Sequence, residues 1–180
     1  MIPSHPLPPA PNATPYPAVF VRAVLRVLGN EGGFVDLAAD PGGATSFGIS
    51  HRDYPNLDIR NLTRDGAIAI YFRDFWRTGR YGELPESIAV KLFDLSINMG
   101  PSHATRCLQR ALRACSFPTV EDGDLGEVTV IAATRANCSA LLAALRSEAA
   151  GYYRSTAELA RKGADGKAEF LDGWLRRAYQ

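Results

Sequence analysis

Two stretches of this chain indicate its fold, Glu31-Gly32-Gly33 and Asp40-Pro41-Gly42-Gly43-Ala44-Thr45-Ser46-Phe47-Gly48-Ile49. Glu31 follows an apolar run over residues 19–28 that predicts a helix, and Gly29, with the glycines after Glu31, is typical of a helix end. A carboxyl group there meets the negative end of the helix dipole, which disfavours its charged form and raises its pKa. Asp40 follows in a glycine-rich turn. Hydrolysis of a glycosidic bond requires one protonated and one ionised carboxyl group, and this pair can supply them.

Each part of this pattern also has a purely structural interpretation. Two glycines after a helix form an ordinary C-terminal cap, and Asp-Pro-Gly-Gly is an ordinary turn. Only the combination of the two stretches favours an active site over an ordinary helix cap and an ordinary turn.

That combination resembles glycoside hydrolase family 108, the bacterial and phage N-acetylmuramidases. The family signature reads Glu-Gly-Gly-aromatic and then Asp-Pro-Gly-Gly-x-Thr-x-aromatic-Gly-Ile, and this chain supplies both parts at the family spacing. The resemblance implies that Glu31 is the general acid. It implies that Asp40 stabilises the oxocarbenium-like transition state or activates water. Thr45 fills the threonine position of this family, whereas Ser46 fills the hydroxyl position of more distant phage-type lysozymes, so either hydroxyl can position the water.

The resemblance extends over roughly residues 19–178. Its further blocks are Tyr71-Phe72-Arg73-Asp74-Phe75-Trp76, Phe93-Asp94-Leu95-Ser96-Ile97-Asn98-Met99-Gly100-Pro101, Asp122-Gly123-Asp124-Leu125-Gly126, and Phe170 with Gly173, Trp174 and Arg177. The C-terminal blocks are similar to the peptidoglycan-binding segment that follows the catalytic part in such enzymes. We therefore expect a proline-rich extended arm over residues 1–18, a lysozyme-like catalytic part over 19–93, and a helical peptidoglycan-binding part over 94–180 packed against it.

The expected fold class is mainly α (α+β). The resemblance implies a lysozyme-like helical fold with a small β-hairpin over the active-site cleft. Strand candidates are Phe34-Val35 and Phe47-Gly48-Ile49-Ser50, on either side of the Asp40 turn. Further helices are expected from Thr63, as N-cap, to about Thr78, from Pro85 or Glu86 to Gly100, from Pro101 onward, and over residues 127–135, 138–162 and 168–179.

Asp94, Asn98 and Phe47 are the candidate substrate-binding residues. Asp94 and Asn98 lie one helical turn apart, so both can face the cleft and bind sugar groups. The alternative is an internal polar pair that braces its helix against the Glu31 segment. Tyr153 and Trp174 can stack on sugars, but their helical spacing favours core packing. The sequence from Asp122 to Asp124 lacks the spacing of an EF-hand calcium site, which favours a turn.

Composition is typical of a soluble globular protein, with 180 residues, 46% hydrophobic residues and a net charge of +1. The charge gives no indication of nucleic-acid binding. No stretch approaches the length of a membrane anchor. Residues 1–18 hold seven of the twelve prolines and lack the basic and apolar regions of a secretory signal peptide. The three cysteines lack metal-ligand spacing and are expected to be reduced. No metal site is expected, and the resemblance implies an enzyme that needs no cofactor.

The sequence therefore predicts a monomeric muramidase that cleaves the β-1,4 bond between N-acetylmuramic acid and N-acetylglucosamine in bacterial peptidoglycan. The resemblance implies a phage or prophage endolysin for host lysis, made in the bacterial cytoplasm and acting on the cell wall after release, for example through a holin. Two alternatives are a muramidase that serves toxin or effector export and an inert wall-binding or morphogenetic protein of the same fold. Gene neighbours separate the two enzyme roles, and intact Glu31 and Asp40 argue against the inert protein.

Overall fold

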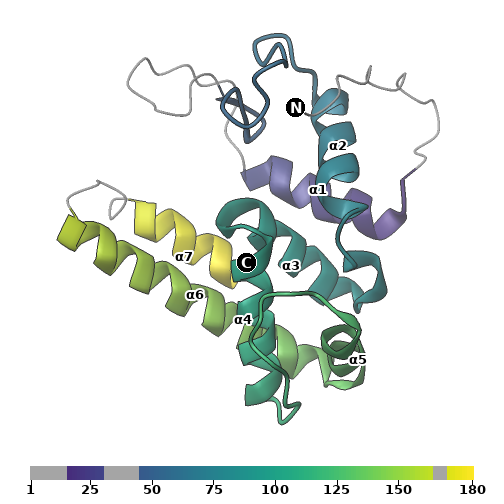
Figure 1. The fold of residues 1–180 in the computed structure, drawn as a ribbon, viewed down its shortest axis with the longest axis vertical. Helices are drawn as coiled ribbons and strands as arrows, with labels where there is room; N and C mark the ends of the chain where they lie inside the picture. Colours follow the sequence, from purple (N-terminus) through teal and green to yellow (C-terminus); the bar gives the residue numbers. More distant parts are fainter. Residues whose placement is uncertain (1–15, 31–44, 164–169) are drawn as a thin grey trace. The chain divides into compact units, whose positions relative to one another are not determined.

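The computed structural model describes residues 16–30, 45–163 and 170–180. The chain divides into two compact units, Met1–Gly79 and Arg80–Gln180. Within the described residues the fold is mainly α with one small antiparallel hairpin (Figure 1), as the sequence predicts. None of the helices described combines the length and the apolar character that crossing a membrane requires.

The first unit begins with α1 (Ala18–Asn30), which buries one apolar face. Phe20, Ala23, Val24 and Val27 are fully buried at the three- and four-residue spacing of an amphipathic helix. The prediction that Gly29 ends this helix is wrong, because Gly29 lies within it. A single glycine costs a helix only about 0.5–1 kcal/mol relative to alanine, which packing of the apolar face offsets.

The hairpin consists of β1 (Thr45–Ser46) and β2 (Ile49–Ser50), with Thr45 opposite Ser50 and Ser46 opposite Ile49. Phe47 and Gly48 form its two-residue turn with φ angles of 53° and 76°. Positive φ at both positions is the signature of a type I′ turn, whose twist matches that of the flanking strands. The prediction of a strand from Phe47 to Ser50 is therefore wrong for its first two residues. The other strand candidate, Phe34-Val35, and the Asp40 turn lie outside the described residues.

A continuous helical segment, α2 (Arg64–Tyr71) followed by the π-helix η1 (Phe72–Trp76), completes the first unit. Thr63 caps α2 as predicted, since its hydroxyl accepts a 3.1 Å hydrogen bond from the Gly66 N–H. The predicted helix to about Thr78 instead changes to π-helix after Tyr71. Arg77 donates its N–H to the Phe72 carbonyl at 2.9 Å, the i to i+5 bond of a π turn.

All the regular secondary structure described in the second unit is helical, and an irregular loop joins α4 to α5. It comprises η2 (Tyr81–Glu83), α3 (Glu86–Met99), α4 (Pro101–Ala114), α5 (Glu127–Arg135), α6 (Cys138–Gly163) and α7 (Leu171–Tyr179). The long helix α6 packs against α3, α4, α5 and α7 (Figure 1). The predictions for α3 to α6 are confirmed, whereas α7 begins at Leu171, and Ala168, its predicted start, lies outside the described residues.

Gly100 and Pro101 determine where α3 ends and α4 begins. Gly100 has a φ of 88°, a backbone conformation that residues other than glycine rarely adopt. Pro101 is the first residue of α4, where the N–H that proline lacks would have no partner within the helix. The functional boundary predicted between residues 93 and 94 lies inside α3, within the second unit. That boundary stays a prediction.

Candidate active site

Glu31 and Asp40, the two predicted catalytic carboxylates, lie outside the described residues. The structure does describe the segments on both sides of them. The helix α1 ends at Asn30, the residue before Glu31, and β1 begins at Thr45, five residues after Asp40. The candidate site is therefore framed by α1 and by the hairpin.

The segment α2–η1 contacts both parts of this frame. The ring centroids of Phe72 and Trp76 lie 5.0 and 5.3 Å from that of Phe20 on α1, both in edge-to-face geometry. Tyr71 is 1% exposed and donates its hydroxyl to the Phe47 carbonyl oxygen in the hairpin turn at 2.8 Å. The block from Tyr71 to Trp76 thus contacts the first turn of α1, the helix that precedes residue 31, and the turn of the hairpin that follows residue 44.

The two candidate hydroxyls, Thr45 and Ser46, lie on opposite faces of the hairpin, because successive strand residues alternate in direction. Ser46 and its partner Ile49 are buried at 4% and 3% exposure, whereas Thr45 and its partner Ser50 are half-buried. A single bound water can therefore meet one of these hydroxyls, not both.

Asp74 of η1 forms the polar cluster that sequence reasoning missed. Tyr54 donates its hydroxyl to Asp74 Oδ2 at 2.7 Å, and Arg73 donates Nε and Nη2 to the two carboxylate oxygens at 2.5 and 2.7 Å. The hydrogen bonds from Arg73 hold the pKa of Asp74 below its usual range, and burial together with Asp74 raises the pKa of Tyr54. Asp74 is therefore a fixed negative charge that binds the segment after the hairpin to η1. The sequence signal was the Arg73-Asp74 pair inside the Tyr71 to Trp76 block.

Asp94 is fully buried and linked to α7. Its Oδ1 lies 3.5 Å from Arg177 Nε, and its Oδ2 lies 3.9 Å from Lys91 Nζ, while Lys91 donates to the Arg177 carbonyl oxygen. Buried charges are tolerated when they are paired in this way. Asp94 therefore braces α3 against α7, whereas bracing against the Glu31 segment, the alternative that the sequence suggested, stays a prediction. A sugar-binding role for Asp94 stays a prediction.

Asn98 lies on the same helix with an exposed side chain. Its Oδ1 accepts a 2.7 Å hydrogen bond from the Tyr153 hydroxyl. Tyr153 is 2% exposed and stacks on Trp174 with centroids 5.6 Å apart. Core packing of Tyr153 is confirmed. The hydrogen bond from its hydroxyl orients the side-chain amide of Asn98. Sugar binding by Asn98 remains a prediction.

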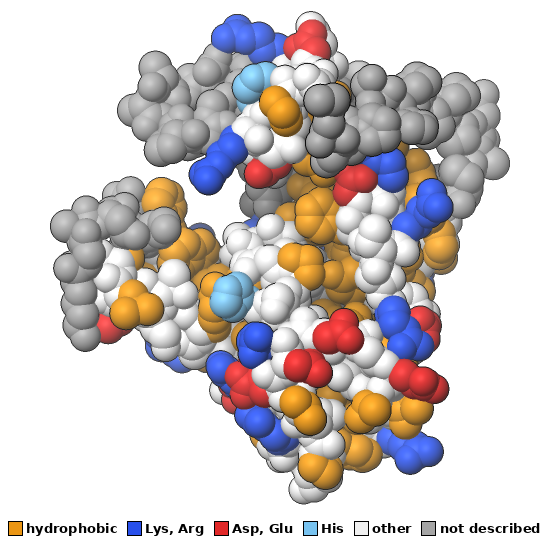
Figure 2. All heavy atoms as spheres, in the orientation of Figure 1, with side chains coloured by type: hydrophobic (Ala, Val, Ile, Leu, Met, Phe, Trp, Pro, Cys, Tyr) orange, Lys and Arg blue, Asp and Glu red, His pale blue; other side chains and the backbone are white. Residues whose placement is uncertain are grey.

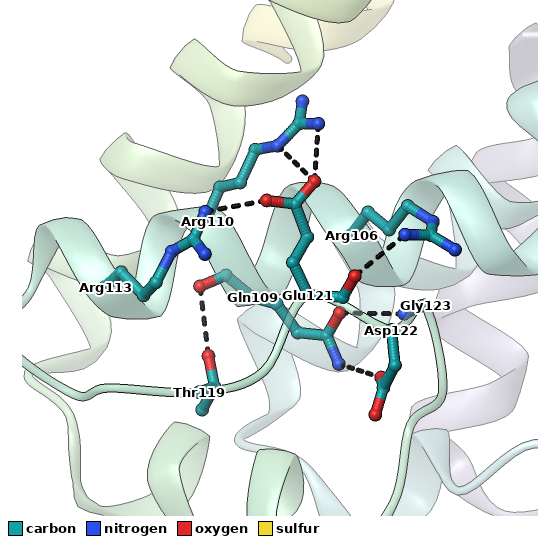
Figure 3. A network of polar contacts seen from close by, with 8 residues as sticks. All are labelled: Arg106, Gln109, Arg110, Arg113, Thr119, Glu121, Asp122 and Gly123. Carbon is teal, nitrogen blue, oxygen red and sulfur yellow. Dashed lines mark hydrogen bonds and ion pairs between the residues drawn. The ribbon is translucent and has the colours of Figure 1, made fainter.

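Gln109 organises the loop that contains Asp122 and Gly123 (Figure 3). Its Nε2 donates to Asp122 Oδ1 at 2.7 Å, and its Oε1 accepts the Gly123 N–H at 3.0 Å. Asp122 Oδ1 also accepts the Asp124 N–H at 2.9 Å, and Gly123 has a φ of 80°. The turn interpretation of this sequence is confirmed.

The described surface offers neither a metal site nor a patch of one charge on the face drawn in Figure 2. Within the described ranges, no group of three or more His, Cys, Asp or Glu side chains is arranged to hold a metal ion. Acidic and basic side chains alternate over the face formed by α4 and α5 in Figure 2. Cys107, Cys115 and Cys138 are free thiols, and Cys107 is buried.

Two parts of the chain match known protein families. Residues 24–100 match the family Glycosyl hydrolase 108, and residues 103–179 match a family described as a predicted peptidoglycan domain. The structure of SagA from Brucella abortus is similar, with 25% sequence identity and a TM-score of 0.66 over 89% of this chain and 93% of that one. No curated protein sequence matches the chain. The first match ends at the junction of α3 and α4, and the second begins in the first turn of α4.

Proposed function

From the premise that the chain belongs to glycosyl hydrolase family 108 and carries a predicted peptidoglycan domain, we propose that it is a peptidoglycan N-acetylmuramidase. The bond cleaved is the β-1,4 linkage between N-acetylmuramic acid and N-acetylglucosamine. The observation that carries the proposal is the family match over residues 24–100, which contains both Glu31 and Asp40. The attachment of both flanking segments to α2–η1 supports it, since catalytic groups need a rigid frame.

Glu31 is the proposed general acid, which protonates the leaving glycosidic oxygen. It directly follows the last residue of α1, where the helix dipole presents its negative end. That field disfavours ionisation and raises the pKa of the carboxyl group, the direction that a general acid needs. Asp40 is the proposed ionised partner, which stabilises positive charge on the sugar ring or activates water.

Thr45 is the hydroxyl that we propose positions the water. Two observations support Thr45 over Ser46: the Thr45 side chain is half-buried, whereas Ser46 is buried against the molecule beside Ile49. Replacing Thr45 with Ala should therefore reduce turnover far more than replacing Ser46 with Ala. A larger loss of turnover on replacement of Ser46 would show that Ser46, not Thr45, positions the water.

Analysis of the reaction products tests the proposed bond specificity. Purified peptidoglycan is digested with the protein, reduced with borohydride, and the fragments are identified by mass spectrometry. Muramidase action predicts that N-acetylmuramic acid carries every new reducing end. Reduced N-acetylglucosamine would identify the opposite glycan bond, and release of peptides without new sugar reducing ends would exclude a glycosidase.

Host lysis by a phage or prophage is the biological role that we propose, on the strength of the resemblance to family members with that role. A holin gene beside this gene would support it. A toxin or effector gene in that place would favour the export role instead. An inert wall-binding protein is disfavoured by the presence of both carboxylates.

A further inference from the structure

The helix α7 has two distinct faces. Its inner face carries Trp174, which stacks on Tyr153, Arg177, which pairs with Asp94, and Ala178, which is fully buried. Its outer face carries Asp172, Leu175, Arg176 and Tyr179, whose spacing of three, one and three residues places them on one stripe. The inner face provides most of the packing of α7, whereas Asp172, Arg176 and Tyr179 on the outer face are exposed.

The outer stripe borders an open hollow of about 580 Å³, lined by Asp172, Leu175, Arg176, Tyr179 and Gln180. Tyr179 is 52% exposed, which makes it one of the few large aromatic side chains at the described surface. Binding sites for small ligands have volumes of roughly 300–1,000 Å³. Because this hollow is open, it suits a segment of a polymer better than an enclosed small molecule.

The charges around the hollow are arranged asymmetrically. Arg176 lies one turn before Tyr179 on α7, and Arg154 comes from α6, which runs alongside α7 (Figure 1), with its Nη2 3.5 Å from the Tyr179 hydroxyl. Asp172 lies at the other end of the stripe, about 10 Å from Tyr179 at the rise of a helix. Within the described parts of the chain, none of these three charged residues forms an ion pair with another residue.

We infer that the hollow on α7 binds the peptide part of peptidoglycan, through carboxylates of the stem peptide. Guanidinium groups bind carboxylates through strong, charge-assisted hydrogen bonds, and two of them flank Tyr179. Tyr179 and Leu175 offer apolar contact to the short side chains of such a peptide. The carboxylate of Asp172 can form an ion pair with an amino group of the peptide. The inference rests on the proposed action on peptidoglycan and adds which component of the polymer the second unit recognises.

Sedimentation of the full chain with purified sacculi tests this inference. Every protein carries Glu31→Gln, so that the wall is not digested during the measurement. Adding Arg154→Gln and Arg176→Gln should weaken binding at least about tenfold, as expected for loss of two charge-assisted contacts. The matched control adds Arg64→Gln and Arg135→Gln, which remove two exposed arginines on α2 and α5, and should leave binding unchanged. Equal melting temperatures for the three proteins exclude unfolding as the cause.

Sacculi whose peptides have been removed by an amidase identify the recognised component. The parent protein should bind these bare glycan strands as weakly as the double variant binds intact sacculi. Undiminished binding to bare glycan would overturn the inference in favour of sugar recognition. Equal binding by the parent and the double variant, or no binding by the parent, would overturn it as well. The proposed hydrolysis is measured separately, as new reducing ends released by the unaltered chain, so either conclusion can fail without the other.

Discussion

The Tyr71 hydroxyl donates a 2.8 Å hydrogen bond to the carbonyl oxygen of Phe47, 24 residues earlier in the chain. Phe47 has a φ of 53° and occupies the hairpin turn, whereas Tyr71 is 1% exposed at the end of α2. This bond joins a strained turn residue to a buried ring. It fixes the hairpin, and with it the candidate hydroxyl Thr45, to the segment that also packs on α1.

Replacing Tyr71 with Phe should therefore lower both stability and turnover. A part-buried carbonyl that loses its donor costs about 1 kcal/mol, and urea unfolding measures that loss. We expect kcat to fall more than KM changes, because the variant loosens a positioning contact and removes no substrate contact. Tyr54→Phe is the control, since it removes a hydroxyl of the same unit that bonds Asp74. Equal kcat losses in both variants would contradict a special role of Tyr71.

Asp74 should contribute stability that disappears in acid. Hydrogen bonds from Arg73 hold its folded-state pKa below the ordinary value, so the unfolded chain binds the proton more tightly. The contribution is thus complete above the unfolded-state pKa near 4 and is lost as pH falls through the lower folded-state pKa. Denaturant unfolding of the native protein and Asp74→Asn at pH 7 and pH 3 measures this. The stability difference between the two proteins should shrink at pH 3, and a constant difference would refute the assignment.

Substitution of Gln109 should destabilise the second unit. It is 1% exposed, and Gln109→Leu removes one of the two donors to Asp122 Oδ1 and the acceptor of the Gly123 N–H. We expect a loss of at least about 2 kcal/mol in the free energy of unfolding. Arg110→Gln, which breaks an exposed pair with Glu121, should cost less than about 1 kcal/mol. Similar costs for both variants would contradict the larger contribution assigned to the buried contacts of Gln109 in Figure 3.

Cys107 should resist thiol reagents in the folded protein. It is 1% exposed, and burial raises the pKa of its thiol to about 11, so little reactive thiolate is present at pH 8. Cys115 and Cys138 are half-buried and should react first. Titration with a disulfide reagent should find two fast thiols in native protein and three in denaturant. Cys107→Ala should retain both fast thiols, and loss of one would show that Cys107 is accessible.

The sequence predicted those features of the fold that local chemistry controls. Thr63 caps α2, and the Gly100-Pro101 pair separates α3 from α4, because a cap and a junction depend on the residues at that position. The hairpin turn was missed because Phe47 adopts a positive φ that only its context enforces. The π turn after Tyr71 was missed because an i to i+5 bond has no characteristic residue type.

Contacts between distant residues account for the rest of what was missed. Asp94 and Arg177 belong to different sequence blocks, and only the packing of α7 beside α3 brings their charges together. The same holds for Arg154 of α6 and Tyr179 of α7. Glu31 and Asp40 were predicted from motif chemistry, and the structure adds the two segments that frame them.

The rate of glycan cleavage by Glu31→Gln tests the central claim most directly. Glutamine keeps the shape of the side chain and removes the transferable proton, so the rate of release of new reducing ends should fall about 10²–10⁴-fold. The melting temperature should stay the same or rise slightly, because a negative charge is removed beside the C-terminal end of α1. A folded Glu31→Gln protein that cleaves peptidoglycan at the native rate would contradict the account.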